Sequence, residues 1–189
     1  MRFRVSLAVL AALLFAGPAF AQTQPVDADP ALEGPAVPAP APDATPPVPP
    51  QPPTLAELVA GHAADTPLDP ESECLARAVY WESRGEPLSG QLAVAEVVIN
   101  RARSGRFAPT LCGVVRQPYQ FSFVRRGAIP EPPRSSRDWH RAVAIARIAT
   151  DRLAEGGAPN ALFFHARRIN PGWRRLTRIA TVGNHVFYR

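Results

Sequence analysis

The chain has 189 residues, which is enough for one ordinary domain, and it carries a formal net charge of +5. All 21 basic residues are arginine, and the charge is unevenly spread. Residues 22–69 contain seven acidic residues and no basic one, whereas residues 70–189 contain 19 arginines and nine acidic residues. This composition argues against several large domains and predicts a cationic body that attracts polyanions.

The first 21 residues have the pattern of a secretory signal peptide. Arg2 and Arg4 precede an apolar run over residues 5–15, and Ala19 and Ala21 form a small-x-small cleavage site. The run is shorter than the roughly 20 residues that cross a bilayer, so we expect no stable membrane insertion after cleavage, with an uncleaved anchor as the alternative. Outside the cytoplasm, nucleic acid is not an expected partner of the cationic body.

Residues 22–69 are predicted to be a disordered acidic spacer. Twelve prolines and no aromatic residue lie between Gln22 and Pro53, so this stretch cannot bury enough apolar surface to fold. A weakly helical segment over residues 54–62 follows it. The folded domain is predicted to cover residues 70–189.

Two long helices open this domain in the predicted order. Asp69 and Pro70 form a strong helix start, and Gly85 supplies the stop. Within this helix, the apolar stripe at helical spacing consists of Leu75, Ala78 and Val79, and it continues into Glu82. A second helix over residues 89–103 is apolar on several sides and is expected to form the centre of the core.

The rest of the domain mixes a third long helix with short strands. This helix is predicted to begin at Ser135 and to end at Gly156 and Gly157. The other predicted elements are a short helix over residues 110–116 and strands over residues 119–123, 162–165, 177–182 and 185–188, the last two joined by a turn at residues 183–184. The predicted class is α+β, with about three main helices and a small antiparallel sheet.

The two cysteines of the chain, Cys74 and Cys112, are predicted to form a disulfide. An exported protein reaches an oxidising compartment, where such pairs form and persist. Two buried thiols are the alternative. A zinc site would need more ligands at closer spacing.

Glu82 is the strongest candidate for chemistry. A carboxyl group on the apolar stripe of a helix loses solvation, which raises its pKa and keeps a proton available near neutrality, as a general acid requires. Pairing with Arg77 or Arg84 is the structural alternative. Glu86 is expected to be a solvated residue at the helix exit, and Glu96 is expected to pair with Arg101 or Arg103.

Several separated motifs resemble those of the SleB-type cell-wall hydrolases, which include spore-cortex-lytic enzymes. They are the run over residues 75–87 around Tyr-Trp-Glu-Ser-Arg-Gly-Glu, Gly90 to Ala95, Asn100-Arg101, Cys112 to Val115, Gln120 to Phe123, Phe164 to Ala166, Pro171 to Trp173, and His185 to Arg189. The resemblance implies a lysozyme-like active-site plan, with a cleft between a helical part and a small sheet, and it assigns Glu82 as the catalytic acid. The chain departs from many secreted relatives at Tyr119, Arg125 and Arg126.

The expected activity is cleavage of peptidoglycan glycan strands between N-acetylmuramic acid and N-acetylglucosamine, as a lytic transglycosylase with one catalytic glutamate. We expect Gln120, Ser122 and His165 to bind the sugar, and Tyr80, Trp81, Phe121 and Trp173 are candidates for stacking on it. The protein is expected to be a monomer associated with the cell wall, secreted or periplasmic, with no cofactor and no bound metal. Two alternatives remain: a zinc amidase with Glu82, His165 and His185 as ligands, and a non-catalytic wall-binding module.

Overall fold

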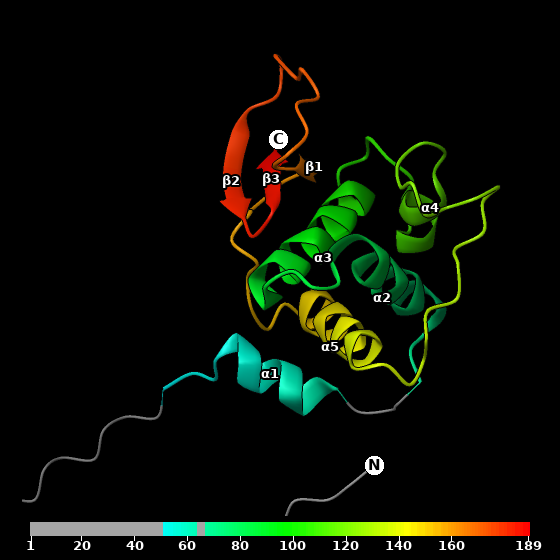
Figure 1. The fold of residues 1–189 in the computed structure, drawn as a ribbon, viewed down its shortest axis with the longest axis vertical. Coiled ribbons are helices and arrows are strands. Elements are labelled where there is room, and N and C mark those ends of the chain that lie inside the picture. Colours follow the sequence, from blue (N-terminus) through cyan, green and yellow to red (C-terminus); the bar gives the residue numbers. More distant parts are fainter. Residues whose placement is uncertain (1–50, 64–66) are drawn as a thin grey trace, which may run out of the picture. The chain divides into compact units, whose positions relative to one another are not determined.

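The computed structural model describes residues 51–63 and 67–189, so the predicted signal peptide and most of the predicted spacer lie outside the described residues. The described elements are, in order, α1 (Leu55–His62), α2 (Pro70–Ser83), α3 (Leu88–Arg103), α4 (Leu111–Arg116), α5 (Arg137–Asp151), β1 (Phe163–Ala166), β2 (Arg178–Val182) and β3 (His185–Tyr188) (Figure 1). The predicted α+β class is confirmed.

Helix α2 forms as its local sequence predicts. The Asp69 side chain accepts hydrogen bonds from the backbone N–H groups of Glu71 and Ser72 at 2.9 and 3.1 Å, which satisfies two of the free donors at the helix start. Gly85, at φ +86°, follows the end of the helix in the left-handed conformation. The predicted apolar stripe is fully buried at Leu75, Ala78 and Val79.

Helix α3 lies between the other helices and the sheet (Figure 1). One face packs with α2 and α5 in the main core, through Leu92, Ala95 and Val98. The opposite face packs under the sheet, where Val94 and Val97 join Phe187 of β3 in a second cluster. The prediction that this helix is apolar on several sides because it is central is confirmed.

The N-cap of α5 lies one residue later than predicted, and the helix ends earlier than predicted. The Ser136 side chain, not Ser135, accepts the capping hydrogen bond from the N–H of Trp139 at 3.1 Å. The helix ends because Arg152 adopts the left-handed conformation, at φ +56°. Leu153 therefore lies beyond the helix and is exposed, and Gly156 belongs to the following loop.

Helix α1 forms at the helical segment predicted over residues 54–62, and it packs on α5. A complete capping box starts it, with Thr54 and Glu57 each accepting a hydrogen bond from the backbone N–H of the other. At its end, Arg147 of α5 donates a hydrogen bond to the carbonyl oxygen of His62 at 2.8 Å. Three side chains of α1 pack against the main core: Leu55, Leu58 and Val59. Among residues 51–63 and 67–189, no helix is long and apolar enough to cross a membrane.

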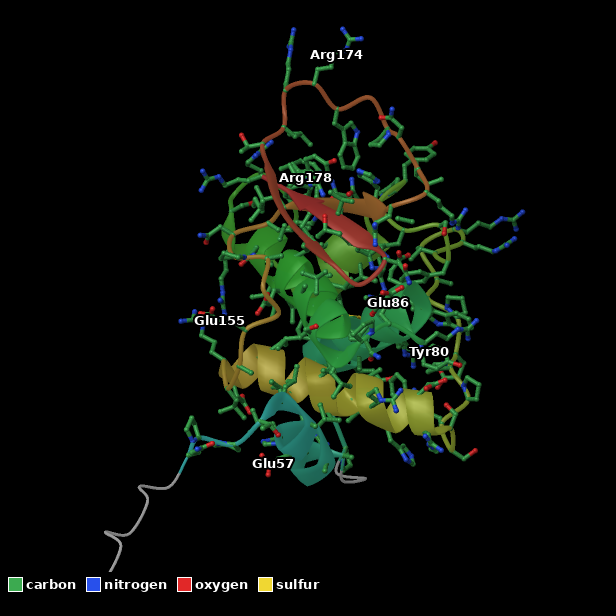
Figure 2. All side chains as sticks on the ribbon, turned by 60° about the vertical axis from the view of Figure 1, so that its left-hand side comes forward. Glu57, Tyr80, Glu86, Glu155, Arg174 and Arg178 are labelled. Carbon is green, nitrogen blue, oxygen red and sulfur yellow. A yellow bond between two sulfur atoms is a disulfide. The ribbon has the colours of Figure 1, made fainter. Side chains whose placement is uncertain are left out.

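The three strands form one antiparallel sheet in the order β1-β3-β2. The central strand β3 pairs Phe187 with Phe164 of β1 and with Ala180 of β2. The strands predicted over residues 162–165, 177–182 and 185–188, and the turn between the last two, are confirmed. Arg174 lies at the outer tip of the loop before β2, and Arg178 lies on β2 itself (Figure 2).

The strand predicted over residues 119–123 is wrong. The segment forms consecutive turns, in which the N–H groups of Gln120 and Val124 donate to the carbonyl oxygens of Gln117 and Phe121. Phe121 is buried in the main core, although no strand lies beside it among the described residues.

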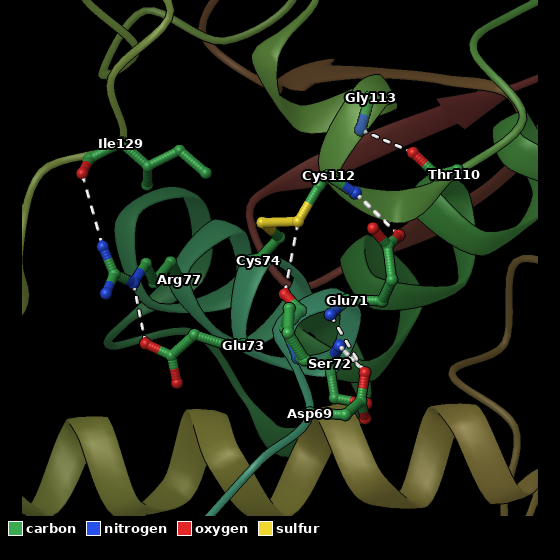
Figure 3. Close-up of a disulfide and its surroundings, with 11 residues drawn as sticks. Asp69, Glu71, Ser72, Glu73, Cys74, Arg77, Thr110, Cys112, Gly113 and Ile129 are labelled. Atoms are coloured by element: carbon green, nitrogen blue, oxygen red, sulfur yellow. Dashed lines mark hydrogen bonds and ion pairs between the residues drawn. A yellow bond between two sulfur atoms is a disulfide. The ribbon is translucent and has the colours of Figure 1, made fainter.

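The predicted disulfide is present and joins α2 to α4 (Figure 3). Cys74 and Cys112 are both buried, and their Cα atoms are 5.1 Å apart. Next to the bridge, the N–H of Cys112 donates to the Glu71 carboxylate at 3.1 Å. The short helix α4 is therefore fixed to the first turns of α2 by a covalent bond and a hydrogen bond.

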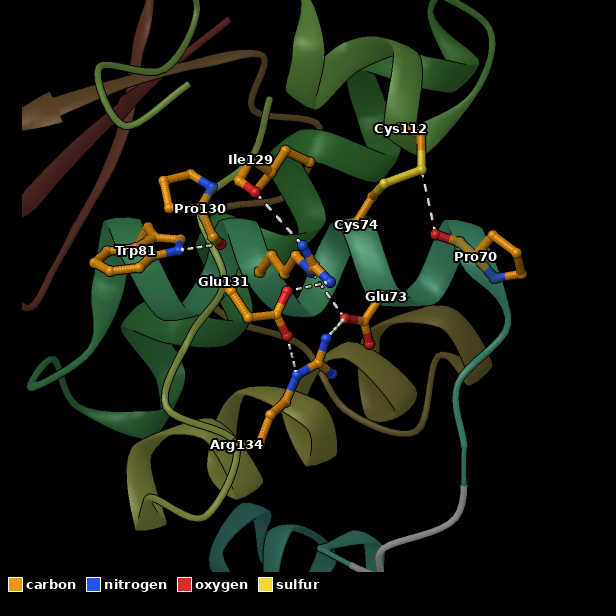
Figure 4. A network of polar contacts seen from close by, with 10 residues as sticks. Pro70, Glu73, Cys74, Trp81, Cys112, Ile129, Pro130, Glu131 and Arg134 are labelled. Carbon is orange, nitrogen blue, oxygen red and sulfur yellow. Dashed lines mark hydrogen bonds and ion pairs between the residues drawn. A yellow bond between two sulfur atoms is a disulfide. The ribbon is translucent and has the colours of Figure 1, made fainter. Parts of the chain in front are cut away.

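An ion-pair network attaches the loop before α5 to the outer face of α2 (Figure 4). Glu73 accepts hydrogen bonds from Arg77 at 2.8 Å and from Arg134 at 2.6 Å, and Glu131 pairs with the same two arginines. One turn further along α2, the indole N–H of Trp81 donates to a carbonyl oxygen of this loop. These contacts attach α2, the helix that carries Glu82, to the loop before α5 along most of the length of the helix.

Candidate active site

Glu82 lies in the last turn of α2 and is largely withdrawn from solvent. Burial raises the pKa of Glu82 to about 7, and the positive charge of Arg101 acts in the opposite direction. A carboxyl group with this pKa is substantially protonated near neutral pH, whereas an ordinary glutamate is ionised there. Glu82 can therefore hold and donate a proton at neutral pH.

The two arginines that were candidates for pairing with Glu82 are engaged elsewhere. Arg77 pairs with Glu73 and Glu131 on the opposite side of the helix. Arg84 donates to the Tyr80 hydroxyl at 3.0 Å, and its guanidinium lies over the rings of Tyr80 and Trp81. In the described part of the chain, Glu82 has no ion pair and no side-chain hydrogen bond.

Arg101 is the cation that acts on Glu82, and its position on α3 is fixed by groups other than Glu82. Its Nε donates to the carbonyl oxygen of Leu162 at 2.7 Å. The guanidinium also lies within 6 Å of three ring centroids, those of Phe107, Phe121 and Phe163. Burial lowers the pKa of Arg101 to about 10, and Glu82 opposes that change. Arg101 thus supplies a fixed positive charge that partly offsets the effect of burial on Glu82.

Two cavities meet at Glu82, which lines both of them. The larger has a volume of about 750 Å³ and is formed mainly by residues 116–127. The smaller, of about 610 Å³, lies between the end of α2 and the sheet, where it is lined by Ala166 of β1 and His185 of β3. A carboxyl group at the junction of two open cavities can reach a bond in the middle of a long substrate. A cleft between helices and a small sheet is also the arrangement that a lysozyme-like plan predicts.

The three residues predicted to bind sugar are not all in this cleft. Gln120 and Ser122 line the larger cavity together with Glu82. His165 lines neither cavity, and its ring nitrogens are hydrogen-bonded to the Ala166 carbonyl oxygen at 2.9 Å and the Tyr188 hydroxyl at 3.0 Å. The structure thus places Gln120 and Ser122 with Glu82 and places His165 in the sheet.

Glu86 connects the end of α2 to the turn between β2 and β3, which corrects its prediction as a solvated residue. Its carboxylate accepts from the backbone N–H of Asn184 at 2.8 Å and from the side-chain amide of Asn184 at 3.1 Å. The turn contains Gly183 at φ +56°, where a Cβ atom would lie 2.3 Å from the Glu86 carboxylate. A side chain at this position would have to displace the carboxylate, and the positive φ also favours glycine. The close approach of the turn to Glu86 holds one wall of the smaller cavity.

His185 is a cleft residue that the sequence offered only as a zinc ligand. It lines the smaller cavity with Glu82 and Glu86. Its side chain is buried, and its Nδ1 atom has no hydrogen-bond partner among the described residues. Burial lowers the pKa of His185, the Glu86 carboxylate opposes this, and His165 adds to it. A neutral imidazole here offers the cleft a hydrogen-bonding group with no added charge.

Glu96 lies in a separate part of the molecule, and its predicted pairing with Arg101 or Arg103 is wrong. Its carboxylate accepts from the backbone N–H of Gly156 at 2.8 Å. It lines a different cavity, of about 300 Å³, formed with the loop after α5. Burial raises the pKa of Glu96, the Gly156 hydrogen bond opposes this, and Glu155 adds to it. Glu96 therefore does not share the Glu82 cleft.

Most of the aromatic residues considered for sugar stacking belong to the core. Tyr80 and Phe121 are buried, and Trp81 is partly buried against the loop before α5. Trp173 is 38% exposed but packs edge-on against Phe163 and His165. The exposed aromatic side chain in the larger cavity belongs instead to Tyr119, which the alternating pattern had placed in a strand.

A three-ligand zinc site at Glu82, His165 and His185 is not assembled. Within residues 51–63 and 67–189, no three histidine, cysteine, aspartate or glutamate side chains are grouped so that they could hold a metal ion. Both ring nitrogens of His165 contact oxygen atoms of the sheet, as described above.

The family model and the curated relatives that match this chain all point to enzymes that act on the cell wall or spore cortex. A family model described as Cell Wall Hydrolase matches residues 85–188. The spore cortex-lytic enzyme of Halalkalibacterium halodurans is 36% identical over 120 residues, which are 63% of this chain and 34% of that protein. The spore cortex-lytic enzyme of Bacillus subtilis is 34% identical over 122 residues, covering 60% of this chain and 35% of the relative.

The match to one solved structure covers nearly the full length of that structure. The crystal structure of the catalytic domain of the Bacillus cereus SleB protein superimposes with a TM-score of 0.51 and 29% identity, covering 67% of this chain and 94% of that domain. The chain spans about a third of the length of the two curated relatives and most of this catalytic domain. By the extent of the family match and the agreement in fold, the chain belongs to the cell wall hydrolase family.

Proposed function

We propose that this protein cleaves the glycan strands of peptidoglycan between N-acetylmuramic acid and N-acetylglucosamine, with Glu82 as the catalytic acid. One observation carries the proposal: a carboxyl group whose pKa is raised to about 7 lies where two cavities meet. Protonation of a glycosidic oxygen needs such a group, and a long polymer needs a cleft that continues on both sides of it. The family and the names of the relatives agree with a wall polymer as substrate.

In the proposed mechanism, Glu82 donates its proton to the oxygen that links the two sugars, and this bond breaks. The carbonyl oxygen of the N-acetyl group of muramic acid stabilises the anomeric carbon as the leaving sugar departs. The Glu82 carboxylate then accepts the proton of the 6-hydroxyl of muramic acid, whose oxygen bonds to the anomeric carbon. The product is an anhydro-muramoyl end, no water is consumed, and Glu82 regains its proton.

The arrangement of carboxylates supports a route with one acid. Most glycosidases that hydrolyse use a second carboxylate as nucleophile or base. Glu96 lies in another cavity, and both oxygens of Glu86 accept hydrogen bonds from Asn184. Glu82 is the carboxyl group of this cleft that is left without a protein partner in the described part of the chain.

We also propose that the protein acts outside the cytoplasm, in association with the wall. The signal-peptide pattern of residues 1–21 supports export, and the proline-rich stretch that follows supports a spacer that gives the domain reach. Arg167 and Arg168 line the smaller cavity and supply positive charge there. Charge of this sign favours an anionic polymer.

Mass spectrometry of digested peptidoglycan tests the reaction directly. We expect muropeptides with anhydro-muramoyl ends and with the stem peptide still attached, and the same products after treatment with a metal chelator. Reducing muramic acid ends in their place would show hydrolysis. Release of free stem peptides, stopped by the chelator, would show an amidase and would refute the proposed reaction.

The rate should fall as the pH rises through about 7. The reacting form of Glu82 is the protonated one, and its raised pKa of about 7 means that this form predominates below pH 6 and is lost above pH 8. We therefore expect the kcat/KM for soluble glycan strands to fall about tenfold for each pH unit above pH 8. Binding of the same strands by the Glu82→Gln variant serves as the control, because it should lack this transition. A rate that stayed constant or rose between pH 7 and 9 would contradict the assignment.

A further inference from the structure

The larger cavity beside Glu82 is lined by two arginines at its rim. The catalytic role of Glu82 does not require these two arginines. Arg116 and Arg126 both line this cavity and are exposed to solvent. Glu82 is the one carboxyl group among the lining residues. Because the Glu82 carboxyl group is substantially protonated near pH 7, the cavity has a net positive charge there.

Both arginines are held on short, well-defined pieces of backbone. Arg116 is the last residue of α4, the helix that the disulfide attaches to α2. Arg126 lies at the tip of a tight turn, closed by two 3.0 Å backbone hydrogen bonds between Arg125 and Ala128. Arg126 and Gly127 at the centre of this turn have φ values of +52° and +78°, as a two-residue hairpin turn requires.

Neither guanidinium has an acidic partner in the described part of the chain, and neither donates a hydrogen bond within it. Elsewhere the same chain does pair its arginines, as Arg77 and Arg134 show with Glu73 and Glu131. The two arginines at the cavity rim are therefore available to an anion from outside. Guanidinium groups bind carboxylates well, because their N–H donors match the two oxygens of the anion.

Tyr119 adds an apolar surface to the same cavity. Its side chain is fully exposed, although a ring of this size is usually at least partly covered. Its backbone has a φ of +64°, which is uncommon for a residue other than glycine and costs free energy. An exposed ring on a strained backbone at the mouth of a cavity is suited to stacking on a ligand.

We infer that the larger cavity is a subsite for an acidic muramoyl unit, in which Arg116 and Arg126 bind carboxylate and Tyr119 stacks on the sugar ring. The inference rests on the proposed function and specifies its substrate: a glycan strand that carries carboxylates next to the bond being cleaved. Two sources share this chemistry: the carboxylates of the stem peptide, and the lactyl carboxylate of a muramic acid that carries no peptide, because attachment of the peptide converts that carboxylate into an amide. A neutral strand lacks both and fits the subsite less well.

Binding measurements in the Glu82→Gln background test this subsite without cleavage. The test variant adds Arg116→Gln and Arg126→Gln, and a matched control adds Arg125→Gln and Arg174→Gln. Arg125 lies on the same turn and Arg174 at the outer tip of the loop before β2 (Figure 2), and neither lines a cavity that contains Glu82. Each variant is titrated with peptide-bearing strands, with strands freed of peptide, and with neutral chito-oligosaccharides.

We expect the test variant to bind peptide-bearing strands about tenfold more weakly, and the control about twofold more weakly or less, since exposed charge pairs contribute modestly. Neutral oligosaccharides should bind equally to both. A loss confined to peptide-bearing strands identifies the carboxylates of the stem peptide. A loss of the same size on peptide-free strands shows that the subsite also binds the lactyl carboxylate, which is free only in those strands. Lysine at both positions, which keeps the charge, should restore part of the affinity.

Equal affinities of the test and control variants for every ligand would overturn the subsite. An equal loss of affinity for the neutral oligosaccharides would also overturn it. Either result concerns binding by the variants and says nothing against the reaction products expected of the native protein. Failure of the proposed function appears separately, as an absence of anhydro ends in the digest of the native protein.

Discussion

Replacing Glu82 by Gln is expected to lower the turnover of glycan strands by about 10²–10⁴-fold, which is the usual contribution of a positioned acid. The amide keeps the shape of the side chain and removes the proton that the reaction needs. Strand binding should persist, because both cavities keep their lining residues. The measurement is the rate of muropeptide release by the purified variant, with binding of strands measured in parallel.

The same change should stabilise the protein at alkaline pH. The pKa of Glu82 is raised to about 7 in the folded protein, above its value in the unfolded chain. The folded state therefore loses stability as the pH rises from about 4.5 to 7, by about 3 kcal/mol for a shift of this size. Since Gln does not ionise, the variant should match the native protein at pH 4 and exceed its free energy of unfolding by that amount at pH 8.

Glu86→Gln and Glu96→Gln are the matched controls for this experiment. Both remove one carboxylate, but Glu86 is bonded to Asn184 and Glu96 lies in another cavity. We expect a much smaller loss of turnover from each, in proportion to any loss of stability. A Glu82→Gln protein that released muropeptides at the native rate would exclude the assigned acid, and a native protein that bound the wall without any turnover would indicate a docking module.

Removing the disulfide is expected to lower the free energy of unfolding by about 3–4 kcal/mol. The bridge joins residues separated by 38 positions, and the chain-entropy model assigns this stabilisation to a loop of that length. Cys74→Ala with Cys112→Ala removes the bridge without adding a polar group to two buried positions. The midpoint of thermal unfolding should fall by about 10–20 °C in this variant.

Reduction of the native protein provides the control for this effect. Dithiothreitol should lower the unfolding midpoint of the native protein to near that of the double variant, and should leave the variant unchanged. A difference below 1 kcal/mol between the native and double-variant proteins would mean that the contacts between α2 and α4 hold without the bridge.

The helices were predictable where the signals that define them lie within a few residues of each other. Asp69, Pro70 and Gly85 mark the ends of α2, and the structure uses them in that way. The end of α5 was missed because the left-handed residue is Arg152, whereas sequence patterns point to glycine for that role. The loop after Arg152 is held to α3 by the hydrogen bond from Gly156 to Glu96, a contact that the local sequence does not show.

The features that were predicted wrongly depend on contacts between residues that are distant in the sequence. Residues 119–123 alternate like a strand because Phe121 faces the core, yet no second strand is present beside them among the described residues. Glu96 satisfies a backbone N–H of Gly156, 60 residues away, and a backbone partner leaves no mark in a charge pattern.

In the site too, features set by neighbouring residues could be predicted, and features set by residues distant in the sequence could not. The stripe on α2 points Glu82 toward the core, and this could be read from the helix period alone. The roles of Arg101, Asn184 and Tyr119 could not be read in that way. Arg101 acts through space from another helix, Asn184 meets Glu86 across 98 positions, and Tyr119 lies in a turn that resembles a strand.

The hydrogen bonds between Glu86 and Asn184 also affect when the cleft can exist during synthesis. Glu82 and its helix are made early, but the wall that faces them across the smaller cavity includes Asn184 and His185. A nascent chain shorter than about 185 residues therefore carries the acid without a complete cleft to bind substrate. Contacts over so long a separation form slowly, so the protein acquires a complete cleft only after most of its chain has been made.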